Sequence, residues 1–511
     1  MGALVTAGSR PARVGEETPA ALVEALVDLG ADFDELLFLC RSGEAELADA
    51  AADLEAASAA LHARTRETLV DQLAAARLRY GAVVERLRDL RALAARERAG
   101  HSLAQLCAEK SSLADLLRVE RALTAALVTA ADWQSPSFLH STAPAAGRQN
   151  GLIRPFWNDY KRDRHLDAEG YERRYLTAMV DGPSTLRALL TSCGMAAFTT
   201  IVAFLLGERR VDRPILFGQG LYHESRLLLE RLLPGRTHAV DESDSSALVH
   251  AIGELQPSAV FLDSLSNTKS MPLPELPPVI EALSHTDAYL VVDNTCLSVA
   301  CQPFALARDS VRVIVFESLL KYAQLGLDRT NAGVIVARRE DAELLAGYRE
   351  HLGTNVADVA VHALPHPERS VLERRLARLQ RNAALLADRL DGRCGSFARI
   401  VYPGLPSHPC YQVARRLRFR GGCLSILLRR SDLRLRRERA LVDEAIAEAS
   451  ARGIALLGGS SFGFDTTRIY LTAARAECGE PFVRIAAGTE HRLEIEELAD
   501  ALALAVSRAA A

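Results

Sequence analysis

The sequence predicts a three-layer α/β domain, preceded by a helical region and followed by a smaller α+β domain. Three changes of pattern along the chain indicate this order. From about residue 20 to 130, Ala, Leu, Arg and Glu dominate and apolar residues recur three and four positions apart, which is typical of amphipathic helices. From about residue 152 to 390, short apolar runs alternate with helical patterns. Beyond that point, two strand-like runs lie between helices.

Five apolar runs predict the buried strands of the central domain. Helical segments separate the runs, so we expect parallel strands with crossover helices on both faces of the sheet. Ligands of such sheets bind at the carboxyl ends of the strands. The predicted strands are residues 215–217, 259–262, 289–292, 311–315 and 333–336.

The two outer regions follow from the same reasoning. A helical stretch at 372–390 precedes predicted strands at 421–428 and 467–471. Pro and polar residues at 135–137 and 141–151 predict a linker before the central domain. We expect the N-terminal helices to pack on a neighbour or to cap an oligomer, because charged helical faces are usually structural. The predicted division is a flexible tail at 1–18, a helical extension with its linker at 19–150, the α/β domain at 151–390 and the α+β domain at 391–511.

Composition narrows the classes of function. The 511 residues carry a net charge of −4, with 49% hydrophobic and 25% charged residues, which excludes a disordered or collagen-like protein. Without a basic excess, we expect no nucleic-acid partner. Small-molecule chemistry is favoured.

The cysteines and the N-terminal residues indicate the cellular compartment. Nine scattered cysteines without a C-x-x-C pair indicate neither a disulfide framework nor a metal site, and we expect mostly buried, reduced thiols. Residues 1–18 lack a secretory pattern, and no apolar run is long enough to cross a membrane. We therefore expect a cytoplasmic protein without a membrane partner.

An acid and a lysine follow neighbouring predicted strands. Asp293 directly follows the run at 289–292, and Lys321 comes 28 residues later, after the next run. This placement suits a pyridoxal phosphate (PLP) site, in which the lysine forms a Schiff base and the carboxylate keeps the pyridine nitrogen protonated. Taken alone, the pair also fits a helix-capping Asp and a surface Lys.

Four longer motifs in the chain resemble those of a known enzyme family. Residues 292–296, 318–322 and 421–425 resemble the motifs V-D-N-T-F, S-x-T-K-Y and G-G-M-x-S, and residues 402–409 reproduce Y-P-G-L-P-S-H-P. On these motifs, which occur in the same order, the chain from about residue 160 onward resembles the cysteine/methionine-metabolism group of fold type I PLP enzymes, which includes cystathionine γ-synthase, cystathionine γ-lyase and methionine γ-lyase.

The resemblance implies roles for residues around the cofactor ring. Lys321 would bind the cofactor and move protons between Cα and Cβ of the substrate, while Asp293 would hold the ring nitrogen protonated. Tyr222 would stack on the ring and exchange a proton with the substrate side chain. Asn267 would lie beside the ring hydroxyl.

Further residues would hold the phosphate and the substrate. Gly194 and Met195 would present backbone N–H groups to the cofactor phosphate at a helix start, and Ser318 would add a donor. Arg484 would bind the substrate α-carboxylate, a task suited to a guanidinium fork. Arg468 is a rival for that task.

The resemblance also implies a homo-oligomer. Tyr160 and Arg162 match the family's Tyr-x-Arg pair, which reaches the phosphate of the adjacent subunit. Active sites would then be shared across a dimer interface, and by analogy two dimers would form a homotetramer.

Three departures from the family pattern place the substrate in question. Leu320 replaces the family threonine that binds phosphate. Glu224, after His223, could contact an unusual substrate or form a surface ion pair. We expect the serine of the family's S-L-G motif to fall on or near Leu456 or Leu457, where this chain has no serine.

These observations predict a PLP-dependent carbon–sulfur or carbon–heteroatom lyase. It would eliminate a β- or γ-leaving group from an L-amino acid through aldimine, quinonoid and vinylglycine-type intermediates. The altered residues favour an unusual substrate, for example a halogenated, unsaturated or sulfur-containing amino acid. Two alternatives stay open: a γ-replacement transferase of the cystathionine γ-synthase kind, and a non-catalytic oligomeric scaffold.

Overall fold

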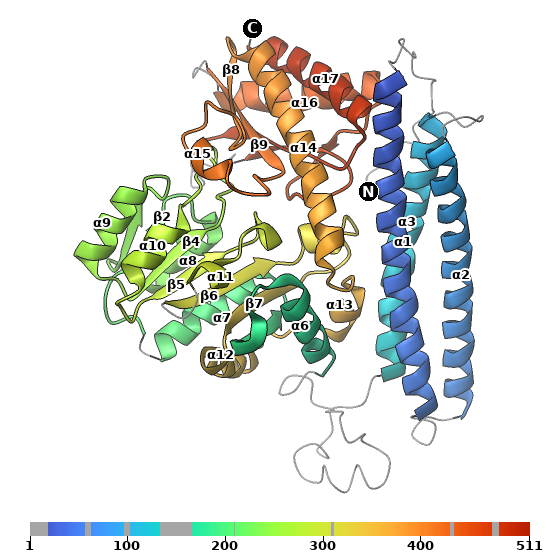
Figure 1. Cartoon of the computed structure of the whole chain (residues 1–511), viewed down its shortest axis with the longest axis horizontal. Coiled ribbons are helices and arrows are strands. Elements are labelled where there is room, and N and C mark those ends of the chain that lie inside the picture. Colours follow the sequence, from blue (N-terminus) through green and yellow to red (C-terminus); the bar gives the residue numbers. More distant parts are fainter. Residues whose placement is uncertain are drawn as a thin grey trace, which may run out of the picture.

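A computed structural model describes most of the chain. The described residues are 19–56, 63–96, 103–132, 166–208, 210–307, 311–429, 434–472 and 480–510. Within them, three long helices lie beside a chain segment built on two separate sheets (Figure 1).

The N-terminal region is a bundle of three antiparallel helices, as the sequence predicts. They are α1 (Pro19–Ala56), α2 (Ala63–Arg96) and α3 (Leu103–Asp132). Phe33, Tyr80 and Leu117 are fully buried in the core that the helices share. Gly43 allows the close approach of α2, because a Cβ at that position would collide with the ring of Tyr80.

The bundle packs against the rest of the same chain. Helix α3 contacts α13 (Asp358–Ala363), and α1 contacts α17 (Arg492–Ala510). The buried Arg121 donates hydrogen bonds to the carbonyl oxygens of His362 and Leu364, at 3.1 and 2.9 Å. Glu46 interacts with the rings of His362 and His366. These pairs satisfy charges that burial alone would make costly.

The central sheet has seven strands in the order β1-β7-β6-β5-β4-β2-β3. Every predicted strand is present, and two more were missed: β1 consists of residues with helix propensity, and β3 is a partly exposed edge strand. The strands are β1 (Leu186–Thr191), β2 (Ile215–Gly218), β3 (Thr237–Val240), β4 (Ala259–Asp263), β5 (Tyr289–Asp293), β6 (Arg312–Ser318) and β7 (Gly333–Arg338).

One prediction about this sheet is wrong. Strands β2 to β6 are parallel, but β7 is antiparallel to both of its neighbours, β1 and β6. The reason is the connection: residues 319–332 hold only the single turn η3 (Tyr322–Gln324), with no crossover helix to carry the chain back.

Helices cover both faces of the sheet, because successive strand residues point to opposite sides. In β5, Val291 packs with one group of helices, and Leu290 and Val292 pack with the other. The first group is α7 (Gly194–Gly207), α8 (His223–Leu232) and α12 (Arg339–Leu352). The second group is α6 (Leu166–Met179), α9 (Ser245–Leu255), α10 (Leu276–Leu283) and α11 (Pro303–Ala307).

Helix α14 (Arg369–Cys394) connects the two sheets and lies beside the N-terminal bundle (Figure 1). Leu372 and Leu379 pack into the core of the central sheet, whereas Leu386 and Leu390 pack into the C-terminal core. The predicted domain boundary after residue 390 falls inside this helix, and the division into domains stays a prediction.

The C-terminal sheet has five strands in the order β10-β11-β12-β9-β8. Helices α14, α16 and α17 pack against it. Its elements are β8 (Ala398–Val401), α15 (Tyr411–Ala414), β9 (Cys423–Leu428), α16 (Arg434–Ala451), β10 (Leu457–Gly458), β11 (Arg468–Thr472), β12 (Phe482–Ala486) and α17.

Candidate active site

Lys321 lies just beyond the carboxyl end of β6. Its Nζ donates a hydrogen bond to Ser461 Oγ at 2.6 Å and lies 5.4 Å from the centre of the Phe462 ring. Burial lowers the pKa of the Lys321 amine, and the positive charge of Arg484 lowers it further. A lysine amine with a lowered pKa is a better nucleophile at neutral pH, as a Schiff-base lysine must be.

Two carboxyl groups end adjacent strands beside this lysine. Asp263 and Asp293 are paired across β4 and β5. Burial raises the pKa of Asp293, while hydrogen bonding with Thr295 and the charge of Lys321 oppose the rise. Burial, together with Asp293 and Glu242, raises the pKa of Asp263 well above its ordinary value. Asp293 has the stabilising partners, so its charged form is favoured over that of Asp263.

A helix start and a strand end form a close junction. Gly194 begins α7, and a Cβ at this position would lie 2.8 Å from Ser318 Cβ at the end of β6. Met195 follows in the first turn, and its Sδ lies 3.7 Å from Ser225 Oγ. The first N–H groups of a helix have no partners within it. They are therefore suited to bind an anion beside Ser318.

Tyr222 and Glu224 lie at the start of α8, which packs on the same face of the central sheet as α7. Burial raises the pKa of the Tyr222 phenol, and so do Glu224 and Asp293, whereas Arg484 lowers it. The Tyr222 side chain is 43% exposed, and its hydroxyl carries a proton that it can donate. Glu224 is exposed in the first turn of α8, and Asn267 is half-buried in the loop after β4.

Arg484 fits an anion-binding role better than Arg468. Its side chain is buried in β12, with the guanidinium 5.8 Å from the centre of the Tyr470 ring. In the part of the chain that the structure describes, no carboxylate forms an ion pair with it. Arg468, by contrast, stacks on Phe464 at 3.4 Å and lies 3.6 Å from Asp328.

The serine that borders Lys321 is not where the sequence analysis places it. Leu456 is buried just before β10 and Leu457 is exposed at its start, whereas the hydroxyl that bonds Nζ comes from Ser461 in the next loop. The sequence at Ser461 is Ser-Phe-Gly, which resembles S-L-G, so this signal could have been found. Asp263 was also missed, although its position at a strand end is a usable signal.

Tyr160 and Arg162 lie outside the described residues, so their predicted role in a neighbouring subunit stays a prediction.

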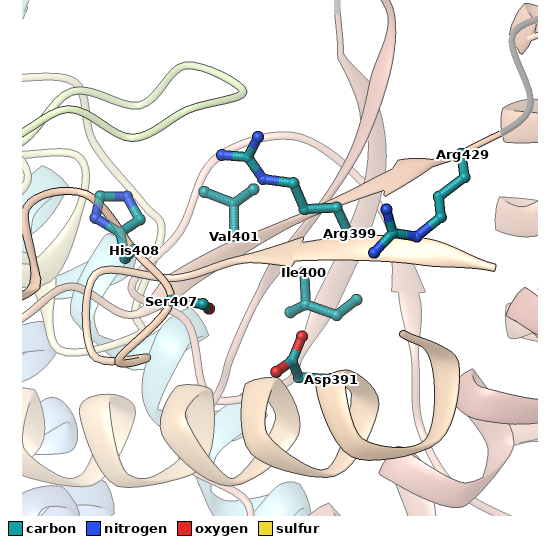
Figure 2. Close-up of a pocket in the computed structure, with 7 residues that line it drawn as sticks. All are labelled: Asp391, Arg399, Ile400, Val401, Ser407, His408 and Arg429. Carbon is teal, nitrogen blue, oxygen red and sulfur yellow. The ribbon is translucent and has the colours of Figure 1, made fainter. Parts of the chain in front are cut away.

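A pocket of about 220 Å³ lies in the C-terminal part and contains none of the predicted site residues. Figure 2 shows Arg399 and Arg429 on one side and Asp391 of α14 on the other. His408 lines it, but its ring bonds backbone groups: Nε2 lies 3.0 Å from Ser270 O, and Nδ1 accepts from Cys410 N at 3.1 Å. The motif at 402–409 thus anchors its loop instead of offering a reactive histidine.

The described residues hold no metal cluster and no disulfide. No three His, Cys, Asp or Glu side chains there are grouped to hold a metal ion, and none of the helices there is long and apolar enough to cross a membrane. The eight cysteines in that part are free, five of them buried, and no disulfide joins them.

Sequence comparison decides the family. A family model for Cys/Met metabolism PLP-dependent enzymes matches residues 124–503, which is well over half of the chain. The chain belongs to this family. The match begins within α3, so the first two helices of the bundle and most of the third lie outside it.

Individual relatives are distant. The chain is 25% identical over 358 residues to the bifunctional enzyme flvA of Aspergillus flavus, a match that covers 68% of this chain and 43% of that protein. It is 29% identical over 275 residues to the L-methionine gamma-lyase of Pseudomonas deceptionensis, covering 52% of this chain and 64% of that enzyme. The chain therefore spans less than two thirds of each.

Solved structures agree on the fold. Cystathionine gamma synthase from Xanthomonas oryzae pv. oryzae, in complex with aminoacrylate and cysteine, superposes with a TM-score of 0.55 at 25% identity. The alignment covers 70% of this chain and 90% of that one. The predicted fold type I architecture is confirmed, with its added N-terminal helices.

The residues present fit the cofactor that this family implies. Oδ1 of Asp263 is buried and has no hydrogen-bond partner among the described residues, and Asp293 stands beside it. A protonated ring nitrogen would compensate this buried acidic pair. The junction of Gly194 and Ser318 leaves no room for a side chain, so backbone can approach a phosphate there. Lys321 completes the set with a half-buried amine whose pKa is lowered.

Proposed function

We propose that this chain is a PLP-dependent lyase that eliminates a β- or γ-leaving group from an L-amino acid. One observation carries the proposal: four groups from both sheets act on one another electrostatically. Asp293 and Arg484 both influence Tyr222, and each also interacts with Lys321. The chain belongs to a family of PLP-dependent enzymes, and this membership supports reading the four groups as parts of one reaction centre.

Bound PLP would supply an electron sink for the charge that develops at Cα. Asp293 would keep the proton on the ring nitrogen, while Gly194, Met195 and Ser318 would hold the phosphate. Asn267 would lie at the ring hydroxyl. These assignments rest on position: each residue follows a strand of the central sheet or begins a helix beside it.

Each side chain around the substrate would have a separate role in the reaction. Arg484 would bind the α-carboxylate through two parallel hydrogen bonds. Lys321 would take the proton from Cα and, for a γ-leaving group, a second proton from Cβ. Tyr222, at the start of α8, would give its proton to the departing group. Glu224, exposed near Tyr222, would contact the substrate side chain and favour an unusual amino acid.

A γ-replacement transferase is the second candidate. The relatives of this chain include an O-succinylhomoserine sulfhydrylase and cystathionine gamma-synthases alongside the lyases, which favours keeping this activity in view. The two activities differ in whether water or a second nucleophile completes the reaction.

The test is a product analysis of the purified, PLP-loaded protein with β- and γ-substituted L-amino acids. Elimination yields a 2-oxo acid and ammonia, and replacement consumes an added thiol and yields a new amino acid. A protein that takes up no PLP, or that is coloured yet turns over nothing in the panel and exchanges no Cα hydrogen, would contradict both activities and favour a scaffold.

We further propose a homo-oligomer, in line with the tetramer expected from the resemblance. Tyr160 and Arg162 would complete the site of an adjacent subunit. Light scattering gives the oligomeric state. Mixing inactive Lys321→Ala subunits with inactive Arg162→Ala subunits would restore part of the activity if sites are shared, whereas unshared sites would stay inactive.

A further inference from the structure

One arginine of the helical bundle reaches both loops that border Lys321. Arg118 lies on α3, outside the segment that matches the family. Its Nε donates to Gly326 O at 3.3 Å, and its Nη2 lies 2.8 Å from Asp465 Oδ2. Gly326 follows Lys321 in one loop, and Asp465 follows Ser461 in the other. A single guanidinium thus joins the two loops from outside.

The two loops are closely packed between Arg118 and Lys321. Gly463 has φ +90°, and a Cβ there would lie 2.9 Å from the carbonyl carbon of Lys321. Gly326 has φ +81°, and a Cβ there would collide with the Asp465 carboxylate. Because both contacts tolerate only glycine, a movement of Asp465 would be passed to Ser461 and to Lys321.

Buried charges hold Asp465 in place. Arg375, on α14, donates to Asp465 Oδ1 at 2.8 Å and to Gly463 O at 2.9 Å. Arg375 is itself paired with Glu35 of α1. Burial alone would raise the pKa of Asp465, but Arg375, Lys110 and Arg118 hold it below its ordinary value. The bundle therefore supplies two of these three positive charges, Lys110 and Arg118, that stabilise the ionised carboxylate.

We propose that Arg118 is a positioning residue of the active site, and that through it the helical bundle keeps the Ser461 hydroxyl on the amine of Lys321. The inference rests on the proposed function, since it takes Lys321 as the reacting group. A guanidinium suits this task because its planar fork fixes two partners in one geometry. Helix α3 is long and packs against α1, α2 and α13, so it is a more rigid support than either loop.

The test compares Arg118→Ala with Arg79→Ala in the full chain. Arg79 pairs with Glu120 at 2.8 Å, so its loss also removes an arginine–carboxylate pair of α3, but inside the bundle and away from both loops. With PLP bound, the exchange of the Cα hydrogen of L-alanine in deuterium oxide is followed by NMR. We expect a fall of about tenfold for Arg118→Ala, the factor of one hydrogen bond to a charged group, and wild-type exchange for Arg79→Ala.

Two further variants separate positioning from general loss of stability. If Arg118 acts through Ser461, Arg118→Ala adds little to the effect of Ser461→Ala, whereas independent effects multiply. Arg118→Lys, which keeps the charge but not the fork, should recover exchange only in part. Multiplying effects in the double variant, or equal losses in Arg118→Ala and Arg79→Ala, would overturn the inference.

A readout without turnover distinguishes this inference from the proposed function. Amide hydrogen exchange measured by mass spectrometry should become faster in peptides covering 459–466 and 319–328 in Arg118→Ala, and not in Arg79→Ala. Unchanged peptides would overturn the role of Arg118 whatever the activity. A wild-type protein that binds no PLP and exchanges no Cα hydrogen would instead refute the proposed function, while the peptide result would still decide the loop linkage.

Discussion

Asp263 and Asp293 stand opposite each other at the carboxyl ends of β4 and β5, in a site where burial raises the pKa of both. The two carboxyls are not equivalent. Asp293 has Thr295 and Lys321 to stabilise its charge, whereas Oδ1 of Asp263 is buried without a partner among the described residues. The surroundings therefore favour the charged form of Asp293 over that of Asp263.

This asymmetry predicts unequal effects of matched substitutions. Asp293→Asn should reduce the Cα-hydrogen exchange of L-alanine by about a hundredfold or more, because the ring nitrogen loses its charged partner. Asp263→Asn replaces the carboxyl that is more readily protonated by a neutral amide and should cost less than about tenfold. Exchange rates of the two PLP-loaded variants check this. The opposite order would show that Asp263 carries the charge.

Tyr222 acts on the leaving group, so its loss should split two activities. Tyr222→Phe should keep the Cα-hydrogen exchange of L-alanine near the wild-type rate, because that step needs Lys321. Release of a 2-oxo acid from a β- or γ-substituted amino acid should fall by about a hundredfold, the usual contribution of a general acid. Equal loss of both activities would place Tyr222 at the Cα step or in the fold.

Arg484 and Arg468 offer a matched pair of arginines on adjacent strands. Arg484→Lys should raise the apparent KM for L-alanine in the exchange reaction by about tenfold, since a bidentate contact to a carboxylate becomes a single one. Arg468→Lys should change this KM less, because Arg468 already contacts Phe464 and Asp328. A larger KM effect at Arg468 would reverse the assignment.

Glu317 predicts how stability depends on pH. It lies within β6 with its side chain buried, and burial raises the pKa of its carboxyl from 4.5 to about 8, although hydrogen bonds from Ser298 and Tyr175 oppose the rise. The folded chain thus holds a proton on Glu317 that the unfolded chain releases. This contribution to stability is full below about pH 4.5 and is lost as the pH rises toward 8.

Glu317→Gln keeps the shape but cannot titrate. Its Tm should therefore fall less than that of the wild type between pH 4.5 and 8, by a difference of about 2–4 °C at the upper end. Thermal unfolding followed by circular dichroism measures this. Glu343→Gln, at an exposed position of α12, is the control and should follow the wild-type curve. Parallel curves for Glu317→Gln and wild type would show that Glu317 is ionised in the folded chain.

The sequence by itself determined the order of the elements and most of the chemistry. Apolar runs located the central strands of the main sheet, and helical periodicity located the bundle, because both patterns repeat over a few residues. Strand ends placed Asp293 and Lys321 at one edge of the sheet, and short motifs identified the family. These features are local, so a single stretch of chain carries each of them.

Only the tertiary structure decided how distant segments meet. The antiparallel direction of β7 depends on a connection without a crossover helix, and the contact of Ser461 with Lys321 joins residues 140 positions apart. Arg118 is 208 positions from Gly326 and 347 from Asp465. Such contacts depend on how whole helices and sheets pack, and a charged residue on a helix face looks the same in sequence whether it meets solvent or an active-site loop.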